Sequence, residues 1–469
     1  MLIRPARGMR DFLPEDVRRR DYAVSVIRDV YERYGFEPLE TPAAENLETL
    51  LGKYGEESNK LIFKILKRGE HEASGQADLA LRYDLTVPLA RVVAEHHAEL
   101  PRFFKRYQIQ PVWRADRPAR GRFREFYQCD IDAIGSKALV VEIELCAAVS
   151  DVFKTLGFSD FVIRLNHRQV LTALLDLSGF ARDQHQAVLI ALDKLDKIGE
   201  EGVREDLGAR GLTPHTVQAF LALFGKVGRL LEENVGESRT GSQLNQALLL
   251  HLQDFVGQHE EGARAVAEMG QILELANATA AEARISIDPS LARGLSYYTG
   301  AIMEISAPGS AGSLGGGGRY DNLIGMFLGR EVPACGFSLG LERILGLMDE
   351  RQMFPSDVHE APAQVMVVLW SAASTRESLE LATDLRAAGL RVDVYPEPEG
   401  VGKQFKYAAR RGVAAVVLVG DQERALGQVA VKTLSTGEQV AVPRDRLVET
   451  IRTKLAGTRA QSIAVTHDS

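Results

Sequence analysis

Cysteine is scarce in this sequence of 469 residues, with only Cys129, Cys146 and Cys335. Three widely spaced cysteines fit neither a disulfide framework nor the paired spacing of a zinc site. The histidines, His71, His167 and the pair at 96–97 among them, also lack metal-ligand spacing with Cys or acidic partners. We therefore expect no protein-bound zinc and a reducing, cytoplasmic location.

Long apolar runs are missing as well. No segment approaches the ~20 apolar residues that a membrane span needs, and the N-terminal letters MLIRPARGMRDFLPED lack an apolar signal core. These features predict a protein without a membrane partner. The net charge of −8 argues against a surface coated with basic residues for nucleic acid, but it leaves room for a local basic groove.

Two common nucleotide-binding motifs are also absent. Four consecutive glycines at 315–318 do not make the dinucleotide fingerprint, because that motif would require a glycine at Tyr320. The phosphate loop fails at Gly402–Lys403, where Gln404 follows the lysine and the earlier glycine is missing. Any nucleotide site in this chain must therefore be built differently.

What the sequence does contain is a strict alternation of side chains from Arg102 to Gly135, interrupted by a polar turn with Pro118 and Gly121. This pattern predicts an antiparallel hairpin with one buried face. The apolar side holds Phe103, Tyr107, Ile109, Trp113, Tyr127, Cys129, Ile131 and Ala133. The other side holds Arg106, Gln108, Gln110, Arg114, Arg124, Phe126, Gln128, Asp130 and Asp132. Isolated Arg, Gln and Asp with an aromatic ring favour a ligand-binding floor, and an ordinary solvated face is the alternative.

Four segments carry a resemblance to a known family. Arg114 at a strand end, a charged loop and the letters FREF at 123–126 resemble motif 2 of the class II aminoacyl-tRNA synthetases, and REFYQCDIDAIG is similar to the histidyl members. The strings LARGLSYYTG at 291–300 and SLGGGGRYDNLIGMF at 313–327 resemble two histidyl-type signatures. Ser296 departs from them, because the family has Asp there. VPACGFSLGLERILGLM at 332–348 resembles motif 3, with its Arg at Arg343.

The remaining chain fits the same family order. Residues 14–34 read as an amphipathic helix followed by an extended segment, which resembles motif 1, the dimer-forming motif. Alternation from Leu79 predicts a strand that carries Arg82, Asp84 and Thr86 on one face, before a helix from Pro88 to Ala98. That face could be an exposed strand with an internal ion pair. The string LRYDLTVP, however, resembles the segment that holds the substrate ammonium in histidyl enzymes.

These segments define the expected domains. We predict an α+β fold: an antiparallel-sheet catalytic domain with a helical insertion, followed by a C-terminal α/β domain. The boundaries are 1–178 and 284–352 for the two parts of the catalytic domain, 179–283 for the insertion, 363–456 for the α/β domain and 457–469 for a disordered tail. The α/β domain resembles the family's anticodon-binding domain, and its helix at 403–411 is either a basic RNA-binding element or simply solvated.

The resemblance implies a histidine–tRNA ligase that uses ATP with Mg²⁺ and binds tRNA as a homodimer. It implies catalytic roles for Arg114 and Arg293 at the α-phosphate. The residues that it implies for histidine are Asp84, Leu85, Thr86, Arg114, Gln128, Asp132, Arg293, Tyr297 and Tyr298. Those that it implies for ATP are Arg114, Asp116, Arg122, Phe126 and Arg343.

Two other functions remain open at the level of sequence. One is a non-catalytic paralogue that serves as a regulatory subunit in histidine biosynthesis, toward which Ser296 points. Such paralogues usually lack the anticodon domain and the Arg signature, both of which are present here. The other is a class II synthetase for a different amino acid, which the LARGLSYYTG string disfavours.

Overall fold

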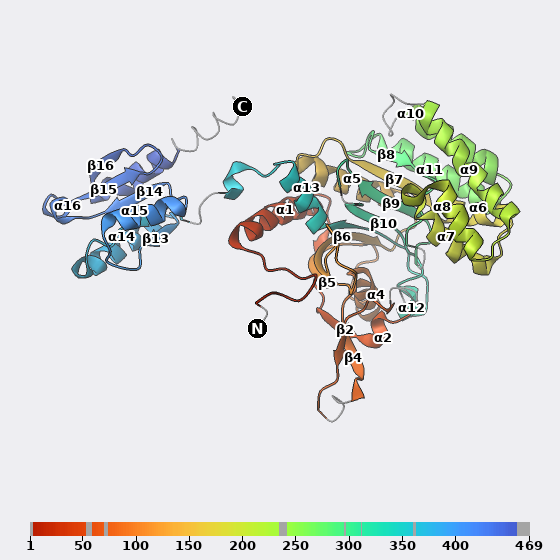
Figure 1. Ribbon diagram of the computed structural model, residues 1–469, viewed down its shortest axis with the longest axis horizontal. Coiled ribbons are helices and arrows are strands. Elements are labelled where there is room, and N and C mark those ends of the chain that lie inside the picture. The colour runs from red at the N-terminus through yellow and green to blue at the C-terminus, as the bar shows by residue number, and fades with distance from the viewer. Residues whose placement is uncertain are drawn as a thin grey trace. The chain divides into compact units, whose positions relative to one another are not determined.

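The computed structural model describes residues 3–52, 59–69, 74–233, 242–294, 297–310, 312–359 and 363–456. The chain divides into two compact units, Met1–Phe354 and Pro355–Ser469 (Figure 1). Two predictions fall on residues outside the described ranges. These are the departure from the histidyl-type signature at Ser296 and the disordered tail at 457–469.

The first unit is built on a mixed sheet. Within the described residues this sheet has eight strands in the order β1-β5-β6-β11-β10-β9-β7-β8. The strands are β1 (Glu37–Pro38), β5 (Phe104–Trp113), β6 (Glu125–Ile134), β7 (Val162–His167), β8 (Ile285–Ile287), β9 (Ala301–Ser306), β10 (Gly315–Arg319) and β11 (Ala334–Gly340). Only the outermost pairs of this described sheet, β1 with β5 and β7 with β8, are parallel. The expected, mainly antiparallel sheet is confirmed.

The predicted hairpin forms β5 and β6, with Arg106 opposite Asp132 and Gln108 opposite Asp130. Its apolar face packs beneath α1 (Pro14–Arg33) and α5 (Val140–Thr155), where Cys129 and Ile131 join one large hydrophobic cluster. α13 (Leu341–Glu350) covers the same face. The hydroxyl of Tyr31 on α1 donates to the carbonyl oxygen of Cys129 at 3.0 Å, which fastens the helix to the sheet.

The polar face of the hairpin is partly covered by α4 (Thr86–Glu95), which packs with Phe104 and Ile134 in a second cluster. The predicted end of the strand at residues 79–86 is wrong, because β4 (Ala77–Leu81) already ends at Leu81. The following helix, α4, begins at Thr86 and not at Pro88. The reason is local, because Oδ1 of Asp84 accepts a hydrogen bond from the backbone N–H of Val87 at 3.0 Å, which starts the helix.

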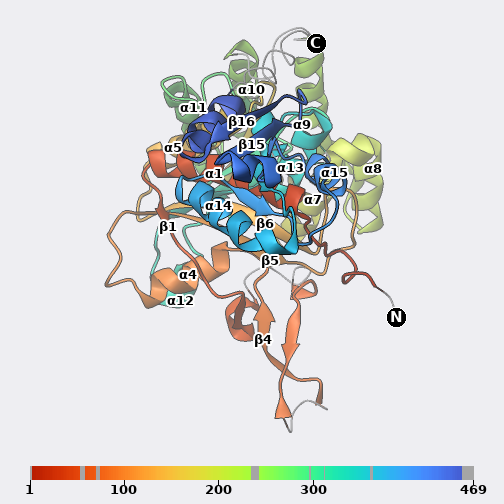
Figure 2. The same ribbon diagram turned by 90° about the vertical axis from the view of Figure 1, so that its left-hand side faces the viewer.

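Beside α4 lies a small three-stranded sheet that projects from the first unit (Figure 2). It has the order β2-β4-β3, with β2 (Ala44–Asn46) and β3 (Lys64–Leu66) antiparallel to β4. The short helices α2 (Leu47–Leu50) and α12 (Gly325–Leu328) contact α4.

A helical group stands at the other end of the first unit. Its members are α6 (Arg168–Ser178), η2 (Arg182–Gln184), α7 (His185–Leu192), α8 (Leu195–Ala209), α9 (Pro214–Glu233), α10 (Ser242–Val256) and α11 (Glu260–Ala276). α6 packs against α9, α10 and α11, and the buried side chains of the group belong to the same hydrophobic cluster as the sheet. The helical character expected between 179 and 283 is therefore present, and it is packed directly onto the catalytic sheet.

The second unit is a mixed sheet flanked by helices. In the described residues its strand order is β13-β12-β14-β15-β16. Its elements are η3 (Ser356–His359), β12 (Val365–Val367), η4 (Ala372–Ser374), α14 (Thr375–Ala387), β13 (Val392–Val394), α15 (Val401–Arg410), β14 (Ala415–Leu418), α16 (Asp421–Ala425), β15 (Gln428–Thr433), β16 (Gln439–Pro443), η5 (Arg444–Arg446) and a helix at 447–456. β12, β13 and β14 are parallel, as the apolar sequences of β12 and β14 predict, whereas β13 carries Asp393 at its centre.

The glycines of β10 are required by the close approach of its neighbours. A Cβ atom on Gly317 would lie 2.1 Å from the carbonyl oxygen of Gly336 on β11, and one on Gly318 would lie 2.5 Å from that of Ala301. Backbone atoms cannot move aside as flexible side chains can, so β10 must remain without side chains here.

We predict that Gly317→Ala lowers the free energy of unfolding by about 1–3 kcal/mol, because the added methyl group overpacks the strand pairing. Urea denaturation followed by circular dichroism measures this loss. Gly346→Ala is the matched control: Gly346 lies exposed in α13 with open space around its Cα, so alanine there should stabilise the protein slightly. Equal stability of the Gly317 variant and the wild type would refute the close approach.

Candidate active site

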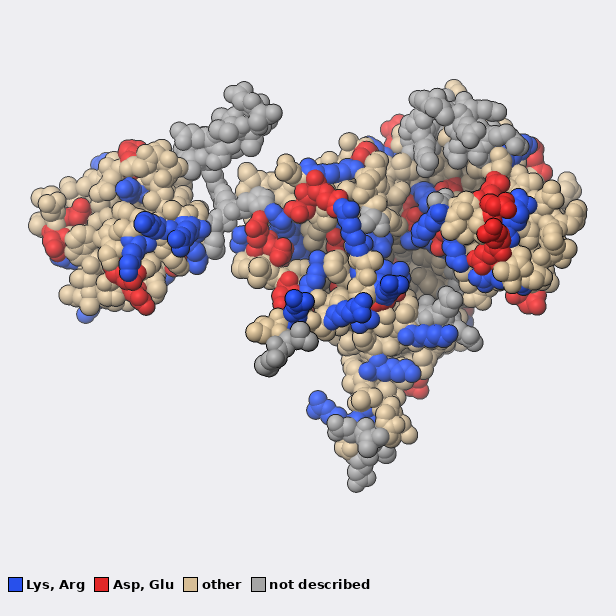
Figure 3. All heavy atoms as spheres, in the orientation of Figure 1, with Lys and Arg blue, Asp and Glu red and all other residues tan. Residues whose placement is uncertain are grey.

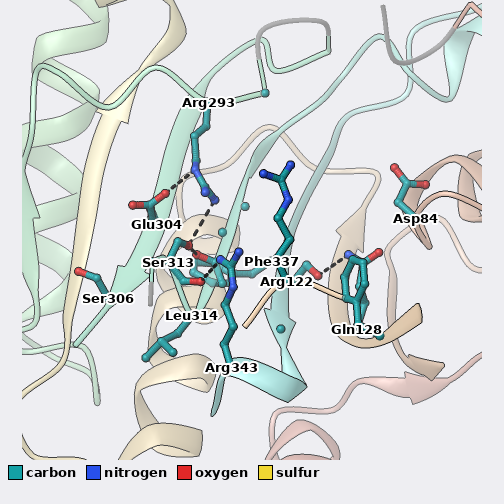
Figure 4. Close-up of a pocket in the computed structure, with 18 of the residues that line it drawn as sticks. Asp84, Arg122, Gln128, Arg293, Glu304, Ser306, Ser313, Leu314, Phe337 and Arg343 are labelled. Atoms are coloured by element: carbon teal, nitrogen blue, oxygen red, sulfur yellow. Dashed lines mark hydrogen bonds and ion pairs between the residues drawn. The ribbon is translucent and has the colours of Figure 1, made fainter. Parts of the chain in front are cut away.

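The polar face of the sheet opens into a cavity of about 900 Å³. Every residue that the sequence predicted for the site lines this cavity except Leu85, whose side chain is completely buried behind it. The lining members of the predicted set are Asp84, Thr86, Arg114, Asp116, Arg122, Phe126, Gln128, Asp132, Arg293, Tyr297, Tyr298 and Arg343. Figure 4 shows several of them converging from different strands and loops.

The floor of the cavity is β6, held between β5 and β11. Gln128 donates from Nε2 to the hydroxyl of Ser338 on β11 at 2.6 Å. Asp132 receives a hydrogen bond from the hydroxyl of Tyr320 and forms an ion pair with Arg106. Gly336 on β11 makes room for this carboxylate, because a Cβ there would lie 1.9 Å from Oδ1 of Asp132. Both neighbours of β6 therefore help to fix its polar side chains.

Arg114 follows β5 directly, where the chain leaves the sheet. Its Nε donates to the carbonyl oxygen of Tyr83 at 3.0 Å. The guanidinium carbon lies 4.3 Å from the ring centroid of Tyr83 and 5.1 Å from that of Phe126. The cation is thus held between two aromatic rings, in a cation–π arrangement that keeps its planar face fixed.

Arg293 is held on the opposite wall by Glu304, a buried carboxylate on β9 (Figure 4). Nη1 of Arg293 also reaches the hydroxyl of Ser313 at 3.3 Å. The second oxygen of Glu304 accepts from Nη1 of Arg164 at 3.2 Å. One carboxylate therefore orients two arginines, and sequence reasoning missed it. Its only signal was an isolated acid in the apolar strand AIMEIS.

Two further arginines complete the cationic wall. Arg343, in the first turn of α13, donates to the carbonyl oxygens of Ser313 at 2.6 Å and Gly121 at 3.1 Å. Burial, and then the neighbouring charges of Arg293, Arg122 and Arg114, lower the pKa of Arg343. Such mutual repulsion marks a site that is short of negative charge and suited to a polyanion.

Arg122 belongs to the loop between β5 and β6, and its Nη2 forms an ion pair with Oδ1 of Asp116 at 2.8 Å. Sequence reasoning gave these two side chains separate tasks, one at phosphates and one at adenine. In the structure they bind each other across the cavity's edge.

Tyr297 and Tyr298 form an edge-to-face pair with ring centroids 4.6 Å apart. Gly294, at a positive φ of 60°, lets the chain turn beneath them, because a Cβ there would lie 1.9 Å from Cδ2 of Tyr298. Burial raises the pKa of Tyr297 to about 12 and raises that of Tyr298 as well. Both hydroxyls therefore stay protonated at neutral pH and can donate hydrogen bonds.

Asp130 is a second acidic residue of the floor that sequence reasoning placed on the polar face but did not assign to the site. It lines the cavity beside Gln128 and is almost completely buried. Burial raises its pKa from 3.8 to about 7; Arg106 and a hydrogen bond with Ser338 oppose the rise, whereas Asp132 and Asp84 add to it. The floor therefore changes charge near neutral pH.

This raised pKa sets the sign of a stability prediction. The native state keeps the Asp130 proton to about pH 7, whereas the unfolded chain releases it near pH 4. Since the native state binds more protons between these values, the free energy of unfolding falls as pH rises through that window. Asp130→Asn removes the charge, so at pH 8 it should be more stable than wild type by on the order of 2 kcal/mol, with little difference at pH 4.

Chemical denaturation at both pH values measures the effect. Asp183→Asn, at an exposed position of η2, is the control and should show no pH-dependent gain. A constant difference between Asp130→Asn and wild type from pH 4 to pH 8 would contradict the raised pKa.

Among the described residues, no group of three or more His, Cys, Asp or Glu side chains is placed to hold a metal ion. No helix in the described part of the chain has the length and apolarity to cross a membrane.

Comparison with known proteins decides the family. A family model described as histidyl-tRNA synthetase matches residues 8–344, and an anticodon-binding-domain model matches residues 364–454. The chain belongs to the histidyl-tRNA synthetase family. The first match spans the sheet, the helical group and the whole cavity, and the second spans the α/β unit, so the predicted class II fold with its C-terminal anticodon-binding domain is confirmed.

Individual members of the histidyl-tRNA synthetase family resemble the chain over nearly its whole length. A histidine–tRNA ligase of Flavobacterium johnsoniae is 39% identical over 95% of this chain and 98% of its own. One of Gloeobacter violaceus is 40% identical over 93% and 95%. The crystal structure of histidyl-tRNA synthetase from Nostoc sp. PCC 7120 has a TM-score of 0.77, 32% identity, and coverage of 97% of this chain and 100% of its own.

A structure from Bacillus halodurans, described as an ATP phosphoribosyltransferase regulatory subunit/histidyl-tRNA synthetase, has a TM-score of 0.71. It is 22% identical and covers 89% of this chain and 98% of its own. At that identity the likeness shows the fold alone.

Proposed function

We propose that this protein is a histidine–tRNA ligase. It activates L-histidine with ATP to histidyl-adenylate and pyrophosphate, and it then transfers histidine to the 3′-terminal adenosine of its tRNA. The observation that carries this proposal is the convergence of Arg114, Arg122, Arg293 and Arg343 on one cavity whose floor is carboxylate and amide. The cations match a triphosphate, and the acids match the cationic end of an amino acid.

Activation needs no covalent enzyme intermediate, because the carboxylate of histidine attacks the α-phosphorus of ATP directly. Catalysis then consists of positioning and of stabilising the charge that develops at the α-phosphate. Arg114 bridges the histidine carboxylate and the α-phosphate. Arg293, held by Glu304, approaches the same phosphate from the other wall. A guanidinium suits this task because it stays charged and offers several donors in a fixed plane.

The ATP contacts follow from the same wall. Phe126 stacks on adenine, and Arg343 holds the outer phosphates together with Arg122. Binding replaces the ion pair between Arg122 and Asp116, so that Asp116 can accept a hydrogen bond from the adenine amino group. Mg²⁺ enters with ATP and neutralises part of its phosphate charge.

Histidine lies on the floor. Asp132 accepts a hydrogen bond from one imidazole nitrogen, and Tyr298 donates to the other, a pairing that rejects side chains without both groups. Asp84, Thr86 and Gln128 hold the α-ammonium group. Tyr297 packs against Tyr298. Leu85 sits behind the cavity and contributes through its backbone rather than its side chain.

The tRNA contacts are assigned to both units. In the second unit, Lys and Arg side chains gather over α15 in the visible face of Figure 3, and α15 carries Lys403, Lys406 and Arg410 around Tyr407. This helix is proposed to bind the anticodon end. In the first unit, Lys and Arg side chains flank the hollow beside the helical group, where the acceptor end would enter (Figure 3). We assign the enzyme to the cytoplasm as a symmetric homodimer, the usual form of class II synthetases.

Arg293→Ala tests the proposed chemistry. We expect this variant to lose histidine-dependent ATP–pyrophosphate exchange by at least about 100-fold, because it removes a cation at the developing charge. Affinity for tRNA, measured by filter binding, should stay within about twofold, since Arg293 acts at the reacting phosphate and not along the tRNA. Arg376→Ala removes a guanidinium that is 91% exposed in the second unit, and exchange should be unaffected. Wild-type exchange in Arg293→Ala would refute the assignment.

A regulatory subunit without synthetase activity is the competing function. It would show no histidine-dependent exchange even in the wild type. The structural features argue against it, because Arg293 is oriented into the cavity and the anticodon-binding unit is present.

A further inference from the structure

A buried arginine lies beside Asp132 on the polar face of the sheet. Arg106 on β5 is 0% exposed, and its Nη2 lies 2.8 Å from Oδ2 of Asp132, the residue directly opposite it on β6. Nη2 also approaches the carbonyl oxygen of Leu85 at 3.4 Å. Its Nε and Nη1 are buried and have no hydrogen-bond partner among the described residues. The guanidinium is therefore only partly satisfied.

Such an arrangement is a poor device for stability. Removing a guanidinium from water costs several kcal/mol, and a buried ion pair can often be replaced by apolar side chains with no loss of stability. Unsatisfied nitrogens make the balance worse. The position of the pair in the molecule suggests another purpose, because its carboxylate is the one that faces the cavity.

Three neighbours fix the position of the Asp132 carboxylate. The hydroxyl of Tyr320 donates to Oδ1, Arg106 binds Oδ2, and Gly336 leaves space that any other residue would fill. The carboxylate lines the cavity with its remaining acceptor capacity. An ionised Asp132 can only accept hydrogen bonds, which suits an imidazole N–H, whereas a protonated Asp132 would present a competing donor.

The surroundings of Asp132 oppose its ionisation. Burial raises its pKa, and Arg106 and then the hydrogen bond from Tyr320 lower it again. The titratable groups that interact with the pair or its neighbours are Tyr31 on α1, Asp84 before α4, Asp130 on β6, Tyr320 after β10 and Cys335 on β11. Arg319 on β10 acts on Cys335, whereas Arg106 acts on Asp132 itself. Arg106 is thus the cation that this layer supplies to its carboxylates.

We propose that Arg106 is a positioning residue for histidine recognition, which keeps the Asp132 carboxylate ionised and aimed at the imidazole without touching the substrate. This inference rests on the proposed function and deepens it by naming the group that sets side-chain specificity. Two arginines of this region then have different tasks. Arg114, directly after β5, acts on the substrate itself, whereas Arg106 on β5 acts through Asp132.

The experiment compares Arg106→Met, Arg106→Lys, Asp132→Asn and the double variant Arg106→Met/Asp132→Asn in ATP–pyrophosphate exchange. Arg106→Met should raise the KM for histidine by on the order of 30-fold while the KM for ATP changes less than about twofold, because only the imidazole contact is lost. Arg106→Lys should recover most of the affinity, since it restores the charge. The double variant should be no worse than Asp132→Asn alone, because both changes act through the same carboxylate.

The pH profile gives a readout that a merely structural role would not move. Without Arg106, Asp132 keeps its proton to higher pH. The acidic limb of kcat/KM for histidine should therefore move upward by about one pH unit or more in Arg106→Met, and much less in Arg106→Lys. If the Met variant does not fold, Arg106→Gln, which keeps a polar side chain without the charge, should show the same displacement.

Arg82→Met is the matched control. Arg82 is also buried, but it donates to the carbonyl oxygens of Thr41 at 2.6 Å and Pro111 at 2.8 Å and to Oε1 of Gln110 at 2.9 Å. Its hydrogen-bond acceptors among the described residues include no carboxylate of the floor. Its loss should lower the melting temperature and leave the acidic limb where it is in the wild type.

Two results would overturn the inference while leaving the proposed function intact. One is an Arg106→Met enzyme with wild-type histidine KM and pH profile. The other is a loss spread equally over the KM values of histidine and ATP. Absence of histidine-dependent exchange in the wild type itself would instead overturn the proposed function, and the inference with it.

Discussion

The pairing of β6 with β5 on one side and β11 on the other is the constraint on which the site depends. It places Asp132 opposite both Arg106 and Gly336, and Gln128 opposite Gly340, although β6 and β11 are about two hundred residues apart in the chain. α13 begins directly after β11, so the same register also sets the place of Arg343. A shift of one residue would turn the whole polar set of β6 toward the hydrophobic cluster beneath α1 and α5.

The two faces of the sheet differ along β5 and β6. The apolar face rests on helices in the ordinary way, whereas the polar face carries carboxylates, amides and a guanidinium with almost no access to water. Burying such groups is costly unless each is paired. Tyr320, Ser338 and Arg106 each engage a carboxylate or amide of β6, although Nε and Nη1 of Arg106 have no partner among the described residues.

Local patterns predicted much of this arrangement. Alternation alone identified the hairpin and separated its two faces, because these features depend on neighbours in sequence. The end of β4 was missed. The backbone N–H of Val87 donates to the Asp84 side chain, and this bond starts a helix where the alternation predicted a strand. Glu304, Tyr320 and the burial of Arg106 were also missed. Each acts through contacts with strands far away in sequence, which no local period encodes. The roles assigned to individual site residues came from family resemblance and remain predictions.

We propose that this floor recognises an imidazole-bearing amino acid and presents it to ATP. The decisive measurement is ATP–pyrophosphate exchange by the purified wild-type protein with each standard amino acid in turn. We expect strong exchange with histidine and background exchange with all others, including those of similar size such as asparagine and glutamine. Exchange supported by a different amino acid, or by none, would contradict it.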